Sequence, residues 1–170
     1  MALIKSYEGI HPDIHPTVTM AENATIVGDV VIGEDSNIWY QAVLRGDVGP
    51  IRIGKRSNIQ DASMLHCTKG LSTCEVGDDV VIGHRVILHG CRIESASLIG
   101  MGAIVLDGAV VESGCIIGAG ALVPQNMRCE SGWIYAGIPA KKVKPLDDQH
   151  YETIRSSAIR YVGEGKKHFK

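Results

Sequence analysis

An aliphatic residue recurs at every sixth position along most of the chain, and this repeat limits the fold more than any other feature of the sequence. The spacing holds through eighteen units, with three extra residues after Leu44, five extra residues after Leu65 and one residue fewer after Leu88. The lead residues are Ile14, Met20, Ile26, Ile32, Ile38, Leu44, Ile53, Ile59, Leu65, Val76, Ile82, Leu88, Ile93, Ile99, Val105, Val111, Ile117 and Val123. No helix has this period, and an ordinary hairpin sheet would not keep it for so long.

The fifth position of each unit is small or β-branched, and glycine often follows the lead residue, where a tight corner needs permissive dihedral angles. One large and one small side chain per unit therefore point inward. We predict an all-β solenoid of short parallel strands, with three units to a coil and about six coils over residues 14–123. Stacked coils lie about 4.8 Å apart and bury the aliphatic ladder.

Composition supports a narrow core. Phe occurs once and aromatic residues make up 5% of the chain, which disfavours a sandwich or a doubly wound sheet. The net charge of -2 and the lack of a Lys/Arg-rich block argue against nucleic acid or an anionic membrane as partner. No apolar run predicts a signal peptide or a membrane span. The five cysteines form no CxxC pair, and their odd number favours buried free thiols in a reduced, cytoplasmic setting.

The sequence divides into four parts. Residues 1–13 form a lead-in, residues 14–123 the solenoid, residues 124–146 an irregular cover and residues 147–170 a C-terminal α-helix with its tail. Asp147 or Asp148 is expected to cap the helix, and Gly163 is expected to end it. The helix carries a stripe that we expect to pack against the solenoid, formed by Tyr151, Ile154, Ala158 and Tyr161.

Two histidines occupy equivalent places in the repeat. The units led by Leu65 and Leu88 fall on one face in successive coils, and His66 and His89 follow their lead residues directly. Their separation along the chain is one coil of three units plus the five-residue insertion. Arg45 occupies the same place one coil earlier. Two imidazoles about 5 Å apart on a rigid edge can share one metal ion.

A third histidine, His84, lies on the preceding face, above Asp61. An extended run of five residues places it roughly 16 Å from His89, which is too far to share an ion within one flat strand. Either the corner folds His84 back, or another subunit supplies the third ligand. We favour the second arrangement, a homotrimer with a metal site at each of its interfaces.

Four polar residues are expected around the same edge: Arg45, Asp47, Gln60 and Asp61. They supply one fixed cation, two carboxylates and one amide. Such groups can orient ligand imidazoles, hold a water molecule or pair across an interface. The alternative is a solvated ladder of salt bridges between coils.

The motifs RGD, NIQD, LH, VIGH and LHG occur in this order, followed by GMGAIVLDGA, GAGALVP and AGIPAK. With them the chain resembles the γ-class carbonic anhydrase family over nearly its whole length. The resemblance implies a left-handed β-helix and a Zn²⁺ ion (with Fe²⁺ or Co²⁺ as alternatives) held by His66 and His89 of one subunit and His84 of the next. It also implies an intersubunit ion pair of Arg45 with Asp61, with Asp47 beside them.

By the same resemblance, Gln60 would hydrogen-bond the metal-bound water. The implied reaction is attack of a metal-activated hydroxide on CO2 to give bicarbonate. The best-known members carry a glutamate proton shuttle on an acidic loop after the first ligand. Here the loop CTKGLSTCE has no carboxylate before Glu75, so we expect slow proton export and low turnover. The alternatives are a hexapeptide acyltransferase or CoA-thioester hydrolase, and a non-catalytic, metal-stabilised trimer.

Overall fold

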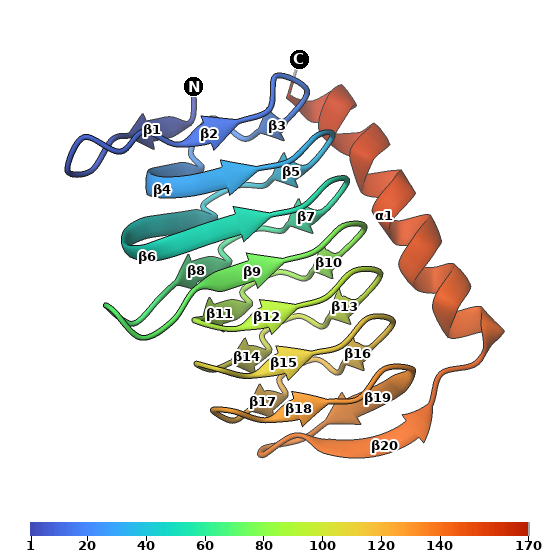
Figure 1. The fold of residues 1–170 in the computed structure, drawn as a ribbon. Coiled ribbons are helices and arrows are strands. Elements are labelled where there is room, and N and C mark those ends of the chain that lie inside the picture. Colours follow the sequence, from blue (N-terminus) through green and yellow to red (C-terminus); the bar gives the residue numbers. More distant parts are fainter. Residues whose placement is uncertain (170) are drawn as a thin grey trace.

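The computed structural model describes residues 1–169 and confirms a parallel β-solenoid followed by one helix (Figure 1). Short strands stack from β1 at one end to β20 at the other, and every coil contributes one strand segment to each of three faces. Helix α1 runs back along the stack toward the N-terminal end (Figure 1). Among the described residues, no helix is long and apolar enough to cross a membrane.

The first two faces are joined by two long strands that turn the corner between them, β4 (Thr25–Ile32) and β6 (Val43–Ile53). The other strands of the first face are β1 (Leu3–Lys5), β8 (Met64–His66), β11 (Ile87–His89), β14 (Ile104–Val105) and β17 (Leu122–Val123). Those of the second face are β2 (Asp13–Ile14), β9 (Cys74–Val76), β12 (Arg92–Ile93), β15 (Val110–Val111) and β18 (Arg128–Cys129).

The third face is a separate sheet that ends in an antiparallel strand. Its parallel strands are β3 (Thr19–Met20), β5 (Asn37–Ile38), β7 (Asn58–Ile59), β10 (Val81–Ile82), β13 (Leu98–Ile99), β16 (Ile116–Ile117) and β19 (Trp133–Ala136). Strand β20 (Lys141–Pro145) closes the sheet by pairing antiparallel with β19.

The solenoid has about seven coils, one more than the repeat predicted. Ile4 pairs with Ile26, so the lead-in contributes a strand to the first face. Cys129 pairs with Val111, and Tyr135 pairs with Ile117. These last two pairs place Cys129 and Tyr135 at lead positions in the segment 124–146, for which we predicted an irregular cover. The count stopped early because it accepted only Ile, Leu, Val and Met as lead residues.

The core is the predicted ladder. Lead residues such as Ile26, Leu65 and Leu88 have no exposed surface. All five cysteines are unpaired and buried, as predicted. Burial raises the pKa of Cys67 and of Cys129 to about 12, which keeps both thiols protonated. Free buried thiols act here as small apolar core residues.

All three breaks in the repeat lie at the corner between the first and second faces. The three extra residues fall within β6, the five extra residues form the loop between β8 and β9, and the missing residue lies between β11 and β12. Pairing resumes in register after each break, with Ile53 opposite Val76 and Val76 opposite Ile93. Changes in length are therefore absorbed at one corner without disturbing the faces.

Helix α1 spans Asp148–His168 and packs on the third face against β3, β5, β7 and β10. Asp147 caps it, because its carboxylate accepts a hydrogen bond from the backbone N–H of His150 at 3.0 Å. Contrary to expectation, the helix continues past Gly163. At Gly165 a Cβ atom would lie 2.5 Å from Oγ1 of Thr19, so glycine here permits close approach of the helix to the sheet.

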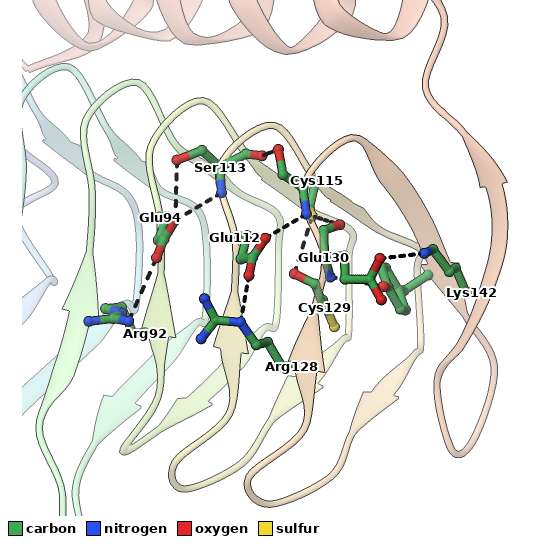
Figure 2. Close-up of polar contacts among 11 residues, drawn as sticks. Arg92, Glu94, Glu112, Ser113, Cys115, Arg128, Cys129, Glu130 and Lys142 are labelled. Carbon is green, nitrogen blue, oxygen red and sulfur yellow. Dashed lines mark hydrogen bonds and ion pairs between the residues drawn. The ribbon is translucent and has the colours of Figure 1, made fainter.

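Charged side chains line one corner of the C-terminal coils (Figure 2). One glutamate per coil directly follows a lead residue of the second face. The three glutamates are Glu94, Glu112 and Glu130, and we call them the acidic corner. Nε of Arg128 donates to Glu112 at 2.5 Å, and Nζ of Lys142 donates to Glu130 at 2.7 Å. The carboxylate of Glu94 accepts from the backbone N–H of Ser113 at 3.2 Å. Each carboxylate of this corner therefore has a permanently charged side chain or a backbone donor as its partner.

Candidate metal centre

His66 and His89 are stacked side by side at the ends of β8 and β11, as the repeat predicted. The two residues are partners in the parallel register of these strands. Nδ1 of His66 lies 3.3 Å from Nε2 of His89, and the ring centroids are 5.3 Å apart. Two nitrogen ligands at about 2.0–2.1 Å from a tetrahedral zinc ion are separated by about 3.3 Å. The pair therefore has the spacing that a shared metal ion needs.

A carboxylate orients each of the two rings. Nε2 of His66 donates to Asp47 at 3.0 Å, and Nδ1 of His89 donates to Asp107 at 2.8 Å. Because an ionised carboxylate only accepts hydrogen bonds, these ring nitrogens carry the protons. In the neutral rings, the two nitrogens that face each other then both present lone pairs. Two lone pairs at this short distance require a cation or a proton between them, and this is the donor set of a metal centre.

Both carboxylates are held in their ionised form. Burial alone would raise the pKa of Asp47, but hydrogen bonds from Arg45 and His66 outweigh it and bring the pKa below its ordinary value. The bond from Nη1 of Arg45 to Asp47 is 2.5 Å long. Burial likewise acts to raise the pKa of Asp107, but hydrogen bonds from Ser72 and His89 lower it. The two groups remain acceptors at neutral pH and below it.

The short loop between β8 and β9 is tied to this centre. Oγ of Ser72 donates to Asp107 at 2.6 Å and accepts from the backbone N–H of Thr68 at 3.0 Å. Glu75, the first carboxylate after His66, lies in β9 on the second face and accepts from Oγ1 of Thr73. The loop therefore supports Asp107 and brings no carboxylate of its own to the site.

His84 lies elsewhere in the chain, in the turn between β10 and β11. Its Nδ1 donates to Asp61 at 2.7 Å, which leaves Nε2 as the nitrogen with the lone pair. The imidazole is 44% exposed. Beside it lies a cavity of about 380 Å³, the His84 pocket, whose solenoid wall is formed by Trp39, Tyr40 and Asp61. His84 thus has the same carboxylate-oriented geometry as the other two histidines, but it faces outward.

The predicted site residues fall into two groups within one chain. Arg45 and Asp47 join His66 and His89, whereas Asp61 joins His84. Gln60 is buried next to Asp61, and its Nε2 donates to Oδ1 of Asn58 at 3.0 Å. Among residues 1–169, no cluster of three His, Cys, Asp or Glu side chains is placed to hold a metal ion. A complete three-histidine site therefore needs a ligand from outside the chain.

Asp107 was not among the predicted site residues. It follows His89 by one regular coil of three units and lies in the motif GMGAIVLDGA. Because one residue is missing after Leu88, Asp107 is the third residue of its repeat unit, whereas His89 is the second residue of its own. A search of equivalent positions in the repeat therefore does not find Asp107. The signal that could have identified Asp107 is its distance along the chain from the candidate ligand His89, which equals the length of one regular coil.

The chain is similar to hexapeptide-repeat proteins, and several of its relatives are named carbonic anhydrases. Residues 90–125 match the family described as bacterial transferase hexapeptide (six repeats). The chain is 54% identical to a probable carbonic anhydrase of Methanocaldococcus jannaschii over 88% of this chain and 93% of that protein. It is 43% identical to the mitochondrial gamma carbonic anhydrase 1 of Arabidopsis thaliana over 92% of this chain and 59% of that protein. A crystal structure of a putative acetyltransferase from Bacillus cereus superimposes with a TM-score of 0.96 at 40% identity, covering 98% of this chain and 96% of that one.

Proposed function

The chain belongs to the γ-class carbonic anhydrase-like family of hexapeptide-repeat proteins, and on that premise we propose that it is a metal-dependent lyase that hydrates CO2 to bicarbonate. One observation carries the proposal. Nδ1 of His66 and Nε2 of His89 face each other at 3.3 Å, and an aspartate at the opposite nitrogen of each ring favours the tautomers whose lone pairs point at each other. A structural salt-bridge ladder has no need of this arrangement.

The ligands would be His66 and His89 of one subunit and His84 of its neighbour in a homotrimer. All three rings have one nitrogen bonded to an aspartate and the other free to bind a metal. Neutral imidazole suits Zn²⁺, with Fe²⁺ and Co²⁺ as alternatives. When bound, the ion would supply the Lewis acidity that activates water as a nucleophile near pH 7.

Other polar residues near the histidines would orient the metal ligands and the reacting water. Asp47, Asp61 and Asp107 hold the ring tautomers of His66, His84 and His89, a role that typically changes metal affinity about 10- to 100-fold. Gln60 would orient the reacting water through its side-chain amide. Arg45 uses one nitrogen on Asp47, and the rest of its guanidinium would pair with Asp61 across the subunit interface.

The loop after His66 predicts a slow enzyme. Residues 67–74 contain no carboxylate, and Ser72 fixes the loop against Asp107. A proton released at the site would therefore leave through solvent, without a side chain of this loop as carrier.

The main alternative is acyl transfer or CoA-thioester hydrolysis. It is favoured by the name of the Bacillus cereus structure and by the description of the matched family. Acyl transfer in this fold needs one catalytic histidine, and three carboxylate-oriented histidines exceed that need. A non-catalytic trimer stabilised by metal is the third candidate.

The decisive test is to purify the protein without oxygen, to measure its metal content and mass in solution, and then to assay CO2 hydration and acetyl-CoA hydrolysis. We expect one metal ion per subunit, the mass of a trimer, and hydration that His84→Ala abolishes. His11→Ala is the matched control, because His11 is exposed and lies outside both groups. Bound metal without hydration would rule out the anhydrase, and a monomeric mass would leave His84 without its proposed partners.

A further inference from the structure

The second wall of the His84 pocket comes from helix α1, which the sequence suggested only as a packing element. Its C-terminal half contributes Arg160, Tyr161 and Glu164 to the lining. The helix is anchored here because Trp39 makes edge-to-face contacts with Tyr161 and Phe169, at centroid distances of 5.5 and 5.2 Å. These aromatic contacts hold the helix wall of the pocket against the solenoid wall.

The two carboxylates of this pocket have partners within the chain, whereas its arginine has none among the described residues. The carboxylate of Asp61 accepts from His84 at 2.7 Å, and that of Glu164 pairs with Lys167 at 2.9 Å. Arg160 forms no ion pair with any carboxylate in the part of the chain that the structure describes. Its guanidinium carbon lies 5.3 Å from the ring centroid of Tyr161, which places the cation over the aromatic wall.

An unpaired guanidinium has a definite ligand preference. It presents a planar fork of N–H donors, which matches a planar oxyanion bidentately. The aromatic side chains of Trp39, Tyr40 and Tyr161 line the same pocket, and their apolar surfaces give an anion a less polar surrounding than bulk water. The cavity, of about 380 Å³, has room for a small ligand.

We propose that Arg160 is an anion-binding residue of the site, which captures a small planar oxyanion beside His84. The inference rests on the proposed function for the identity of the ligand, which is bicarbonate, the product of CO2 hydration. A carboxylate such as acetate, the product of thioester cleavage, has the same chemistry. The position of Arg160 next to a candidate ligand histidine would give it an effect on the reverse reaction, in which bicarbonate is the substrate.

The test compares two arginines of the same helix. Arg160→Gln removes the cation from the pocket, whereas Arg155→Gln removes another exposed cation that does not line it. Isothermal titration calorimetry of the purified protein with bicarbonate, at constant pH and with bicarbonate and CO2 already at equilibrium, measures anion binding without reference to turnover. We expect Arg160→Gln to weaken binding roughly fivefold, the upper range for an exposed charge pair, and Arg155→Gln to leave it unchanged. The KM for bicarbonate should rise with little change in the KM for CO2.

Equal affinities in wild type and Arg160→Gln would overturn the inference, whatever the activity. Binding that depends on Arg160 in a protein without CO2 hydration would leave the anion site standing and remove the proposed function. Acetate that competes more tightly than bicarbonate, through Arg160, would assign the pocket to a carboxylate product instead.

Discussion

The edge that carries His66 and His89 and the acidic corner of Glu94, Glu112 and Glu130 are built by the same repeat, yet their carboxylates have different partners. At the acidic corner, Glu112 and Glu130 pair with Arg128 and Lys142, which are charged at every physiological pH (Figure 2). At the histidine edge, Asp47 and Asp107 bond to imidazoles.

Under the proposed function, the difference separates a structural ladder from a metal-binding one. A carboxylate whose side-chain partner is only arginine or lysine balances that charge and orients no ligand. Asp47 also accepts from Arg45, but its other oxygen bonds to His66. A carboxylate bonded to one nitrogen of a neutral imidazole fixes the proton there and directs the other nitrogen outward as a ligand. Stacking of charged side chains along a solenoid is therefore no sign of a site by itself. The partner of each carboxylate decides whether that carboxylate is a structural group or one that orients a ligand.

The largest effect should follow from removing a ligand. His89→Ala leaves His66 with no second nitrogen at 3.3 Å, so we expect nearly complete loss of bound metal, measured by elemental analysis after dialysis. Arg128→Gln, at the acidic corner, should retain the full metal content. Equal metal in both variants would show that the two regions do not differ in the way proposed.

A smaller effect should follow from Asp107→Asn. An amide at this position can donate to Nδ1 of His89, which would move the ring proton to Nε2 and occupy the lone pair that faces His66. We expect metal affinity to fall about 10- to 100-fold, measured by competition with a chelator. Ser72→Ala, which leaves the carboxylate in place, should cost less. A larger loss of affinity in Ser72→Ala than in Asp107→Asn would show that the loop contact matters more than the carboxylate.

Acid should separate metal binding from folding. The folded pKa values of Asp47 and Asp107 are lowered, so the stability that they contribute is complete above the unfolded value of about 3.9. It is lost as the pH falls through the lower folded values. For the metal-depleted protein we expect unfolding midpoints to be nearly constant from pH 7 to about pH 5 and to decline below about pH 4. Protons compete with the metal for its ligands, so metal release should precede this decline.

The smallest effect belongs to the acidic corner. The N–H of Ser131 and the guanidinium of Arg128 lower the pKa of Glu112, but the pair is solvent-exposed and screened. Glu112→Gln should change neither metal content nor hydration rate, and its thermal midpoint should stay close to that of the wild type. A large loss of metal in this variant would contradict the division of the solenoid into two kinds of ladder.

Register arithmetic was enough to predict that His66 and His89 meet, because the backbone spacing of a solenoid is set by the number of residues per coil. The same arithmetic placed His84 above Asp61, and the structure brings these two side chains into contact. It failed where the partner of a residue depends on how far a side chain extends, or on the exact path of the backbone at a corner. The choice of Asp47 for His66 depends on the path of β6 around the corner, and Asp107 lies one place out of frame.

The ends of the solenoid were also harder to predict. Cys129 and Tyr135 serve as lead residues although neither is aliphatic, because a small thiol or a covered aromatic ring can fill the last coils. The helix passes Gly163 because its length is set by the sheet it covers. In both cases tertiary packing overrode the local signal.

The corner between the first and second faces, where the repeat gains or loses residues, gives this scaffold a place that tolerates change. Chain segments of different length leave and rejoin the stack there, and Leu65 and Leu88 remain in register on either side. A longer loop in place of residues 69–71, carrying its own acidic residue, would keep Cys67 in the core and Ser72 on Asp107, and would therefore leave the stacked histidines where they are. A scaffold built this way can exchange one surface loop independently of the folding of its coils.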